Sequence, residues 1–196
     1  MPRDGFSTGC AGHYERMTSA NAPVEARPRP RVVVVGGGFA GFHTTRALAK
    51  AMGDDVEIVV VSPTNYFLYL PLLPEVAAGI LEPRRISVSF FDALPPSVRH
   101  ATGEVDELDL DARRVGWQDP EGKHHELEYD RIVLAAGSVH KVMPIPGVTE
   151  YAHGFRGVPE ALYLRDHLIR QVDLAAMCED PLERQARLTF VVCGAG

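Results

Sequence analysis

Residues 31–62 read RVVVVGGGFAGFHTTRALAKAMGDDVEIVVVS, and this stretch decides the fold. It opens with the valine run Val32–Val35, and a uniformly apolar, β-branched run is typical of a parallel strand buried on both faces. Glycines interrupt the run, and the pattern from Phe39 to Met52 then predicts a helix. A second apolar run, Val56–Val61, predicts another buried strand. Strand, glycine-rich turn, helix and strand within about 30 residues predict a βαβ unit.

The helix is expected to lie close to the sheet through small side chains at helical spacing. Gly53-Asp54-Asp55 follows it and is expected to end it. The residues predicted to form its sheet-facing side are Ala40, Thr44, Ala47, Leu48 and Ala51.

The glycines of this unit match the pattern G-x-G-x-x-G, and each has its own reason to be glycine. Gly36 makes a tight turn off the strand, Gly38 lets the backbone approach a pyrophosphate, and Gly41 lets the helix pack closely on the strand. The helix N-terminus then offers free N–H groups to the phosphates. The alternative is a turn that needs glycine only for a positive φ. Because a strand precedes the motif and a helix follows it, we expect dinucleotide contacts from Gly36, Gly37, Gly38, Phe39, Ala40 and Gly41.

The ribose of such a dinucleotide is usually bound by an acidic residue about 20 positions after the glycines, at the end of the second strand. Ser62 occupies that position here. Its hydroxyl can hydrogen-bond a ribose, but it carries no charge. We therefore expect weaker binding of the adenosine half of the ligand.

The rest of the chain continues the α/β pattern. Residues 62–79 combine large apolar side chains with prolines, which predicts an irregular loop lining a pocket or a partner surface. Ile86–Phe90 is a candidate short strand. Residues 103–128 alternate weakly around the turn sequence at 119–122, which predicts a small antiparallel meander inserted between parallel strands.

Three further elements follow the meander. Ile132–Ala136 predicts a third buried strand, and Val158–Met177 predicts a helix with Ala161, Leu164, Leu168 and Val172 on one stripe. Leu188–Cys193 is a fourth strand-like run, and Gly194-Ala195-Gly196 comes after it.

Composition excludes several classes of protein. The chain has 196 residues, 45% of them hydrophobic and 23% charged, which is ordinary for a globular domain with a core. Its formal net charge of −6 does not favour nucleic-acid binding, and the sequence contains no Lys/Arg cluster that would bind anionic lipid. Cys10, Cys178 and Cys193 form no C-x-x-C pair, which argues against a disulfide framework, a zinc site and a redox-active pair.

The N-terminus gives no targeting signal. Residues 1–30 are polar, proline-rich and without period, so we expect a disordered leader, with Met17 as an alternative start. No run of 18 apolar residues predicts a membrane span, and no signal-peptide pattern is present. The expected location is the cytoplasm.

Two later segments resemble known flavoprotein sequences. Tyr129–Ser138 resembles the second flavoprotein signature, with Ala136 in place of its usual threonine, although an ordinary parallel strand ending in a glycine turn would read similarly. Ser62–Gly79 resembles the segment of type II NADH dehydrogenases that runs beside the isoalloxazine ring. Asn65 and Pro71-Leu72-Leu73 stand at matching places in it.

The resemblance extends from Arg31 to Gly196 and implies a Rossmann-like FAD-binding domain with a parallel sheet and the inserted meander. Residues 31–156 are the expected first segment of that domain. Residues 157–196 are the expected linking helix and first strand of a truncated NAD(P)H-binding domain, whose own glycine motif would begin with Gly194 and Gly196. The remaining residues expected at the FAD site are Val105, Ala135, Ala136 and Gly137.

For a full-length protein, the resemblance implies hydride transfer from NAD(P)H to FAD, with electrons passed on to a quinone, and a peripheral position on the inner face of the plasma membrane. The 196-residue chain by itself is expected to be inactive. A homodimer is possible, and neither a metal nor a nucleic acid is expected. We assign no catalytic residue; His43 and the pair His124-His125 are expected to be surface or packing residues. The alternatives are a ferredoxin or nitrite reductase of the same superfamily, a non-catalytic FAD-binding fragment, and an NAD-only Rossmann dehydrogenase.

Overall fold

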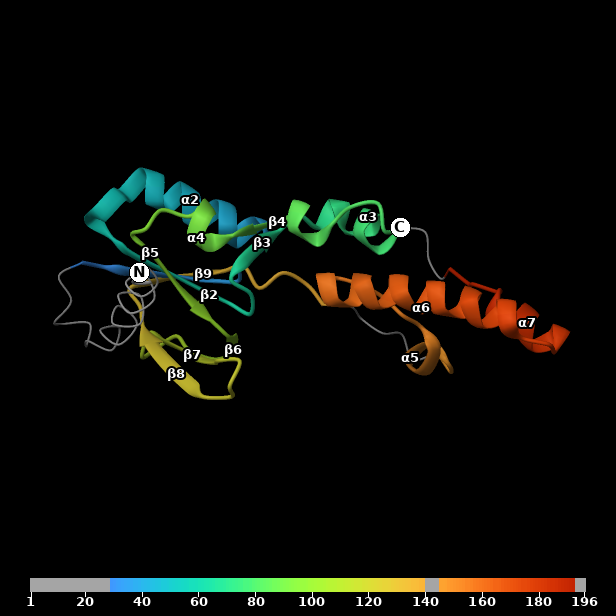
Figure 1. Ribbon diagram of the computed structural model, residues 1–196. Helices are drawn as coiled ribbons and strands as arrows, with labels where there is room; N and C mark the ends of the chain where they lie inside the picture. Colours follow the sequence, from blue (N-terminus) through green and yellow to red (C-terminus); the bar gives the residue numbers. More distant parts are fainter. Residues whose placement is uncertain (1–28, 140–144, 193–196) are drawn as a thin grey trace, which may run out of the picture. The chain divides into compact units, whose positions relative to one another are not determined.

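The computed structural model describes residues 29–139 and 145–192 (Figure 1). The chain divides into two compact units. Among the described residues, the first unit is made by residues 29–67 and 88–138, and the second by residues 68–87, 139 and 145–192. The predicted leader, except for its last two residues, lies outside the described residues.

A four-stranded parallel sheet forms the centre of the first unit. Its strands are β1 (Arg31–Val35), β2 (Glu57–Ser62), β5 (Val98–Thr102) and β9 (Arg131–Leu134), in the order β5-β2-β1-β9. Three of these strands were predicted. Strand β5 was not predicted, because Arg, His and Thr interrupt its apolar residues. The third predicted strand is less buried than expected: β9 lies at the edge of the described sheet, and Leu134 is 62% exposed.

The valines of β1 and β2 alternate between two cores, because successive side chains of a strand point to opposite faces. Val33, Val35, Val59 and Val61 pack with the meander, whose strands are β6 (Glu104–Asp109), β7 (Arg114–Gln118) and β8 (His124–Glu128). The opposite face, with Val34 and Val60, is covered by α2 (Phe39–Met52) and α4 (Phe90–Ala93) (Figure 1). The meander is antiparallel and stands between β5 and β9 in the chain, as predicted.

Helix α2 has the predicted bounds but a different buried side. The buried residues are Gly41, Phe42, Thr45 and Ala49, whereas Ala40, Ala47 and Ala51 are exposed. Gly41 and Thr45, one turn apart, set this orientation: Gly41 allows close contact, and the Thr45 hydroxyl donates 2.8 Å to the Gly41 carbonyl. The predicted helix end is confirmed, since a 3-10 turn (η3, Gly53–Asp55) follows with Gly53 at φ 52°.

The segment predicted to be an irregular loop contains short regular elements. They are strand β3 (Tyr66–Leu68), 3-10 helix η4 (Leu70–Leu72) and helix α3 (Leu73–Ala77). The prolines did not prevent them, because they occupy first-turn helical positions where an N–H is not needed. The predicted strand near residue 88 is confirmed as β4 (Ser87–Ser89), which pairs with β3.

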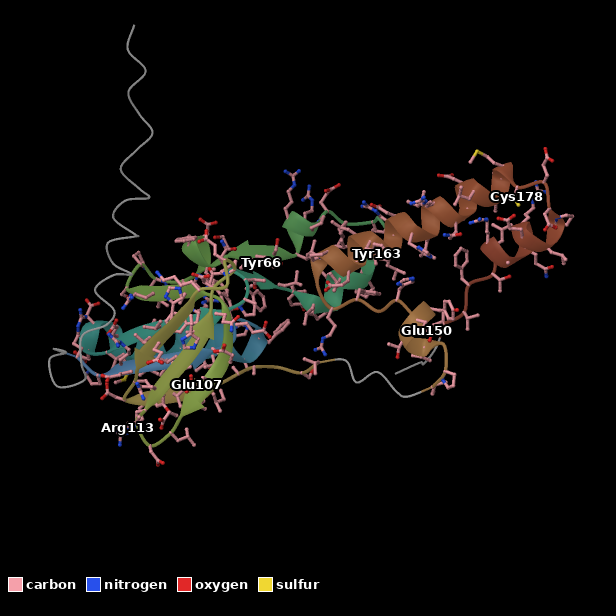
Figure 2. The ribbon with its side chains drawn as sticks, turned by 90° about the horizontal axis from the view of Figure 1, so that it is seen from below. Tyr66, Glu107, Arg113, Glu150, Tyr163 and Cys178 are labelled. Atoms are coloured by element: carbon pink, nitrogen blue, oxygen red, sulfur yellow. The ribbon has the colours of Figure 1, made fainter. Side chains whose placement is uncertain are left out.

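Helices make up the remainder of the second unit. They are η5 (Pro83–Arg85), α5 (Val148–Tyr151), α6 (Val158–Met177) and α7 (Pro181–Arg187). Figure 2 shows Tyr163 on α6, whose bounds match the prediction, and Cys178 just beyond its end. Leu73, Val76, Ile86 and Ala161 form the core of this unit. No helix of the described chain combines the length and apolarity that a membrane crossing requires.

The fourth predicted strand is not observed. Of that run the structure describes residues 188–192, and none of them belongs to a strand. A strand requires a paired neighbour, and no strand of the described chain pairs with these residues. Val191 and Val192 are accordingly exposed.

Candidate functional site

The carboxyl ends of the parallel strands converge on one edge of the first unit. From β1 the chain adds β2 and β5 on one side, and then returns to place β9 on the other side. The strand order therefore reverses at β1, and open α/β sheets bind ligands at such a switch point, outside the carboxyl ends of the strands. The glycine loop follows β1 at this edge, and residues 135–137 follow β9 beside it.

Gly36 and Gly41 are glycines because neighbouring backbone leaves no room for a side chain at either position. Gly36 has φ 98°, and its N–H donates 2.7 Å to the Val61 carbonyl. A Cβ on Gly36 would overlap the Ala135 carbonyl, and a Cβ on Gly41 would overlap the Gly36 carbonyl. These two residues are thus required by the fold itself, in agreement with the roles predicted for them.

Gly38 differs from both, because it faces open space. Its backbone is extended (φ −74°, ψ −166°), and no described atom lies within 4 Å of the place a Cβ would occupy. The Gly38 carbonyl accepts 2.8 Å from the Phe42 N–H and so begins α2. In the described chain no side chain caps the N–H groups of this first turn, and the turn holds no acidic residue. Open backbone beside an uncapped helix N-terminus fits a phosphate group.

Gly37 is buried, with two side chains beneath it. A Cβ there would lie 2.5 Å from Cζ of Phe90 and 2.7 Å from Oγ of Ser62. Ser62 is therefore at the end of β2 under the glycine loop, the place predicted for the ribose contact. The contact between Phe90 and the glycine loop was not predicted, since a single aromatic residue in a weak strand pattern gives no sign of its partner in the fold.

The second signature lies directly against the first. The Ala135 N–H donates 2.8 Å to the Val35 carbonyl, and Gly137 has φ 75°. The Ala135 side chain is 3.4 Å from the Cβ position of Gly41. Two sequence motifs about a hundred residues apart thus form one continuous surface, which small residues keep free of bulk.

The other predicted site residues are distributed more widely. Val105 packs on the core beneath the meander. Asn65 has an exposed side chain, and its carbonyl accepts 2.9 Å from the Phe90 N–H. Pro71 and Leu72 belong to the second unit, and Gly194 and Gly196 lie outside the described residues.

Buried Arg31 and two half-buried charges form an ion cluster near the amino ends of the strands, away from the glycine loop. Nε of Arg31 is 2.7 Å from Oε2 of Glu57, and Arg99 binds the other carboxylate oxygen. Burial alone would raise the pKa of Glu57, but hydrogen bonds from Arg31 and Arg99 outweigh it and hold the pKa below its ordinary value. This cluster is suited to joining strands and is not part of the candidate site.

Among the described residues, the histidines of α2 and the meander and Cys178 place no reactive group at the site. His43 contacts Phe39 and Phe42 from the surface of α2. His125 stacks on Trp117 and lies 2.7 Å from Asp119, and His124 is beside Asp106. In the part of the chain that the structure describes, His, Cys, Asp and Glu side chains form no metal-binding group of three or more. Cys178 lies in the second unit.

Known proteins resemble the whole described chain. The family model for pyridine nucleotide-disulphide oxidoreductases matches residues 30–196. The type II NADH:quinone oxidoreductase NdhA of Mycobacterium tuberculosis is 34% identical in an alignment that covers 91% of this chain. Ndh of the same organism is 31% identical in an alignment that covers 92% of this chain. The chain spans only 37% and 39% of their lengths.

Solved structures agree on the fold. NDH2 from Plasmodium falciparum in complex with NADH has a TM-score of 0.72 at 22% identity, over 80% of this chain and 32% of that one. The sulfide:quinone oxidoreductase from Aquifex aeolicus has a TM-score of 0.62 at 29% identity, over 72% of this chain and 32% of that one. The predicted Rossmann-like fold is confirmed, and the chain belongs to the pyridine nucleotide-disulphide oxidoreductase family.

Proposed function

We propose that this chain forms the FAD-binding front part of an oxidoreductase that takes hydride from NAD(P)H and passes electrons to a quinone. The observation that carries the proposal is the glycine loop at the β1/β9 switch point. Its inner glycines pack the fold, while Gly38 leaves backbone open beside a helix N-terminus. The membership of a pyridine-nucleotide family and the similarity to type II NADH:quinone oxidoreductases support the choice of cofactors and acceptor.

When bound, the flavin supplies the redox chemistry, and the protein supplies binding and orientation. Residues 36–41 would hold the pyrophosphate through backbone N–H groups, and Ser62 would hydrogen-bond the adenosine ribose. Residues 135–137 would let the cofactor lie against backbone. Asn65, Pro71 and Leu72 are proposed to flank the isoalloxazine ring. Residues 31–156 are proposed as the FAD-binding segment, and residues 157–196 as the entry to the NAD(P)H-binding domain.

FAD binding by the 196-residue chain, measured by equilibrium dialysis and flavin fluorescence, is the direct test. Gly38→Ala places a methyl group in the open space, so it should weaken FAD binding at least a hundredfold while moving the melting temperature by less than about 3 °C. Gly41→Ala is the matched variant: its Cβ meets the Gly36 carbonyl, and we expect loss of folding. A wild-type chain that folds without binding FAD, or a Gly38→Ala chain that binds normally, contradicts the proposal.

The acceptor and the location require a second test. Relatives named for quinone or ubiquinone support a membrane-dissolved acceptor, and peripheral attachment to the inner face of the plasma membrane follows as a proposal. The protein extended to the length of its relatives should oxidise NADH with a short-tail quinone. Turnover with ferredoxin or nitrite but not with quinone would instead support the other branches of the family.

A further inference from the structure

The ring of Phe90 lies directly beneath the glycine loop. Phe90 is the first residue of α4 and is 3% exposed, and its Cζ and Cε2 are among the three atoms nearest to the place that a Cβ on Gly37 would occupy. The third atom is Oγ of Ser62. The loop therefore rests on side chains at this point, whereas Gly36 and Gly41 lie against backbone.

These two side chains are the reason that position 37 requires glycine. Gly37 does not have a positive φ, so its backbone conformation is open to residues with a side chain. Gly37 is buried, and a methyl group on it would point into the fold, 2.5 Å from Cζ of Phe90. The Phe90 ring thus limits how closely the loop can approach the core at this residue.

Other aromatic rings hold Phe90 in this position. The ring of Phe42, on α2, lies nearly parallel to it with 6.0 Å between centroids, and the ring of His100, on β5, meets it edge-on at 5.0 Å. Phe67 in turn stacks on Phe42 at 4.5 Å. Because protein interiors are close-packed, a ring confined from two sides has little space to turn away from the loop. Phe90 is therefore a rigid support.

The backbone of Phe90 reaches a second part of the proposed cofactor site. Its N–H donates 2.9 Å to the carbonyl of Asn65, in the segment between β2 and β3. Asn65 is proposed above to flank the isoalloxazine ring, and Gly37 belongs to the loop proposed to hold the pyrophosphate. All three residues belong to the first unit. Phe90 thus supports one region with its side chain and holds the other with its main chain.

We propose that Phe90 is a positioning residue for FAD, which holds the glycine loop where its backbone binds the pyrophosphate and ties that loop to Asn65. This inference rests on the function proposed above. Phe90 acts through Gly37 and Asn65 and takes no part in hydride transfer. Binding groups must be held within about 0.5 Å of their productive geometry, so a loop that settles onto a smaller side chain binds FAD less tightly.

Phe90→Leu tests this role, with Leu94→Ala as the control. Leucine lacks the Cζ and Cε2 atoms that lie beneath Gly37. Leu94 is 8% exposed in the same core cluster, and it is not among the atoms nearest to the glycines of the loop. The two changes remove the same number of buried carbon atoms, so they should lower the melting temperature to a similar extent.

FAD affinity should separate the two variants. Measured by equilibrium dialysis and flavin fluorescence at a temperature where both are folded, Phe90→Leu should raise the Kd for FAD about tenfold or more. Leu94→Ala should change it by less than about threefold, because the loop keeps its support.

A size exchange between positions 37 and 90 distinguishes positioning from packing. Gly37→Ala alone presses a methyl group against the Phe90 ring and should weaken FAD binding about 10- to 100-fold. In the Gly37→Ala/Phe90→Leu chain the methyl group takes the space of the missing ring atoms, and the Ser62 hydroxyl can turn to another rotamer. The double variant should therefore bind FAD at least about fivefold more tightly than Gly37→Ala.

Each contrary outcome has a distinct meaning. A wild-type chain that folds without binding FAD refutes the proposed function itself. If the wild type binds FAD and Phe90→Leu binds it equally well, the positioning role is refuted alone. The same follows if Phe90→Leu and Leu94→Ala weaken binding equally, or if the losses from Gly37→Ala and Phe90→Leu add in the double variant. Misfolding of Phe90→Leu where Leu94→Ala folds would make Phe90 a structural residue.

Discussion

Individual glycines of the loop are glycine for different reasons, and the structure adds one reason that the sequence does not show. The pattern G-x-G-x-x-G is visible in the sequence, and so is the reason for each position. That Gly37 rests on Phe90 and Ser62 was not visible, because Phe90 comes from an element more than fifty residues later. Ser62 was located correctly by its distance from the motif, whereas its contact with a ribose is still a prediction.

Glu57 offers a prediction about stability at the same scale. It bridges Arg31, which is only 2% exposed, and Arg99, so Glu57→Gln leaves a buried guanidinium without its counter-charge. We expect the free energy of unfolding at neutral pH to fall by about 2–4 kcal/mol, measured by urea denaturation. As the control, Glu126→Gln breaks an exposed pair with Arg114 and should cost less than about 0.5 kcal/mol.

The pH dependence of that difference follows from the lowered pKa of Glu57. A carboxylate with a depressed pKa contributes stability fully above the ordinary value of 4.5, and this contribution is lost as the pH falls through the folded-state pKa. The gap between wild type and Glu57→Gln should therefore be largest near neutrality and shrink in acid below pH 4.5. A gap that grows in acid would contradict the bridging role.

At the scale of elements, the bounds of long periodic helices were predicted well. Features that depend on contacts distant in the sequence, such as a buried helix face or an edge strand, were not. The bounds of α2 and α6 agree with the sequence pattern, since fourteen and twenty residues are enough for a clear period. The buried side of α2 was wrong because Gly41 and Thr45 decided the approach, and small size alone does not show which face is inside. Strand β5 was missed because it is an edge strand whose polar residues find partners only in the fold.

The meander is an element whose attachment can be tested. Leu127 of β8 is 3% exposed and belongs to the core that joins the meander to the valines of β1 and β2. Leu127→Ala should lower the free energy of unfolding by about 2–5 kcal/mol. Leu110 lies in the turn between β6 and β7 and is 68% exposed, so Leu110→Ala should change the free energy of unfolding by less than about 0.5 kcal/mol. Equal effects of the two variants, by thermal or urea denaturation, would mean that the meander is not part of the core.

At the scale of the whole molecule, ligand binding should be visible as stability. A ligand that binds only the folded chain stabilises it by about 2.7 kcal/mol at a hundred times its dissociation constant. For a chain of this size that corresponds to a rise in melting temperature of about 5–10 °C with FAD. Riboflavin, which lacks the phosphates, should give little rise, and neither should FAD with Gly38→Ala. A similar rise with riboflavin would show that the glycine loop does not hold the pyrophosphate.

The long return from β5 to β9 also has a consequence for how the chain is made. Val33 pairs with Ile132, so the central strand waits for its second neighbour until nearly a hundred further residues have been synthesised. At typical elongation rates of about 5–20 residues per second, that interval lasts on the order of 5–20 s. Throughout it, one side of a nearly all-valine strand keeps its backbone donors and acceptors unpaired. The nascent polypeptide is therefore most prone to aggregate between the emergence of β1 and that of β9, and this is the interval in which a chaperone would act.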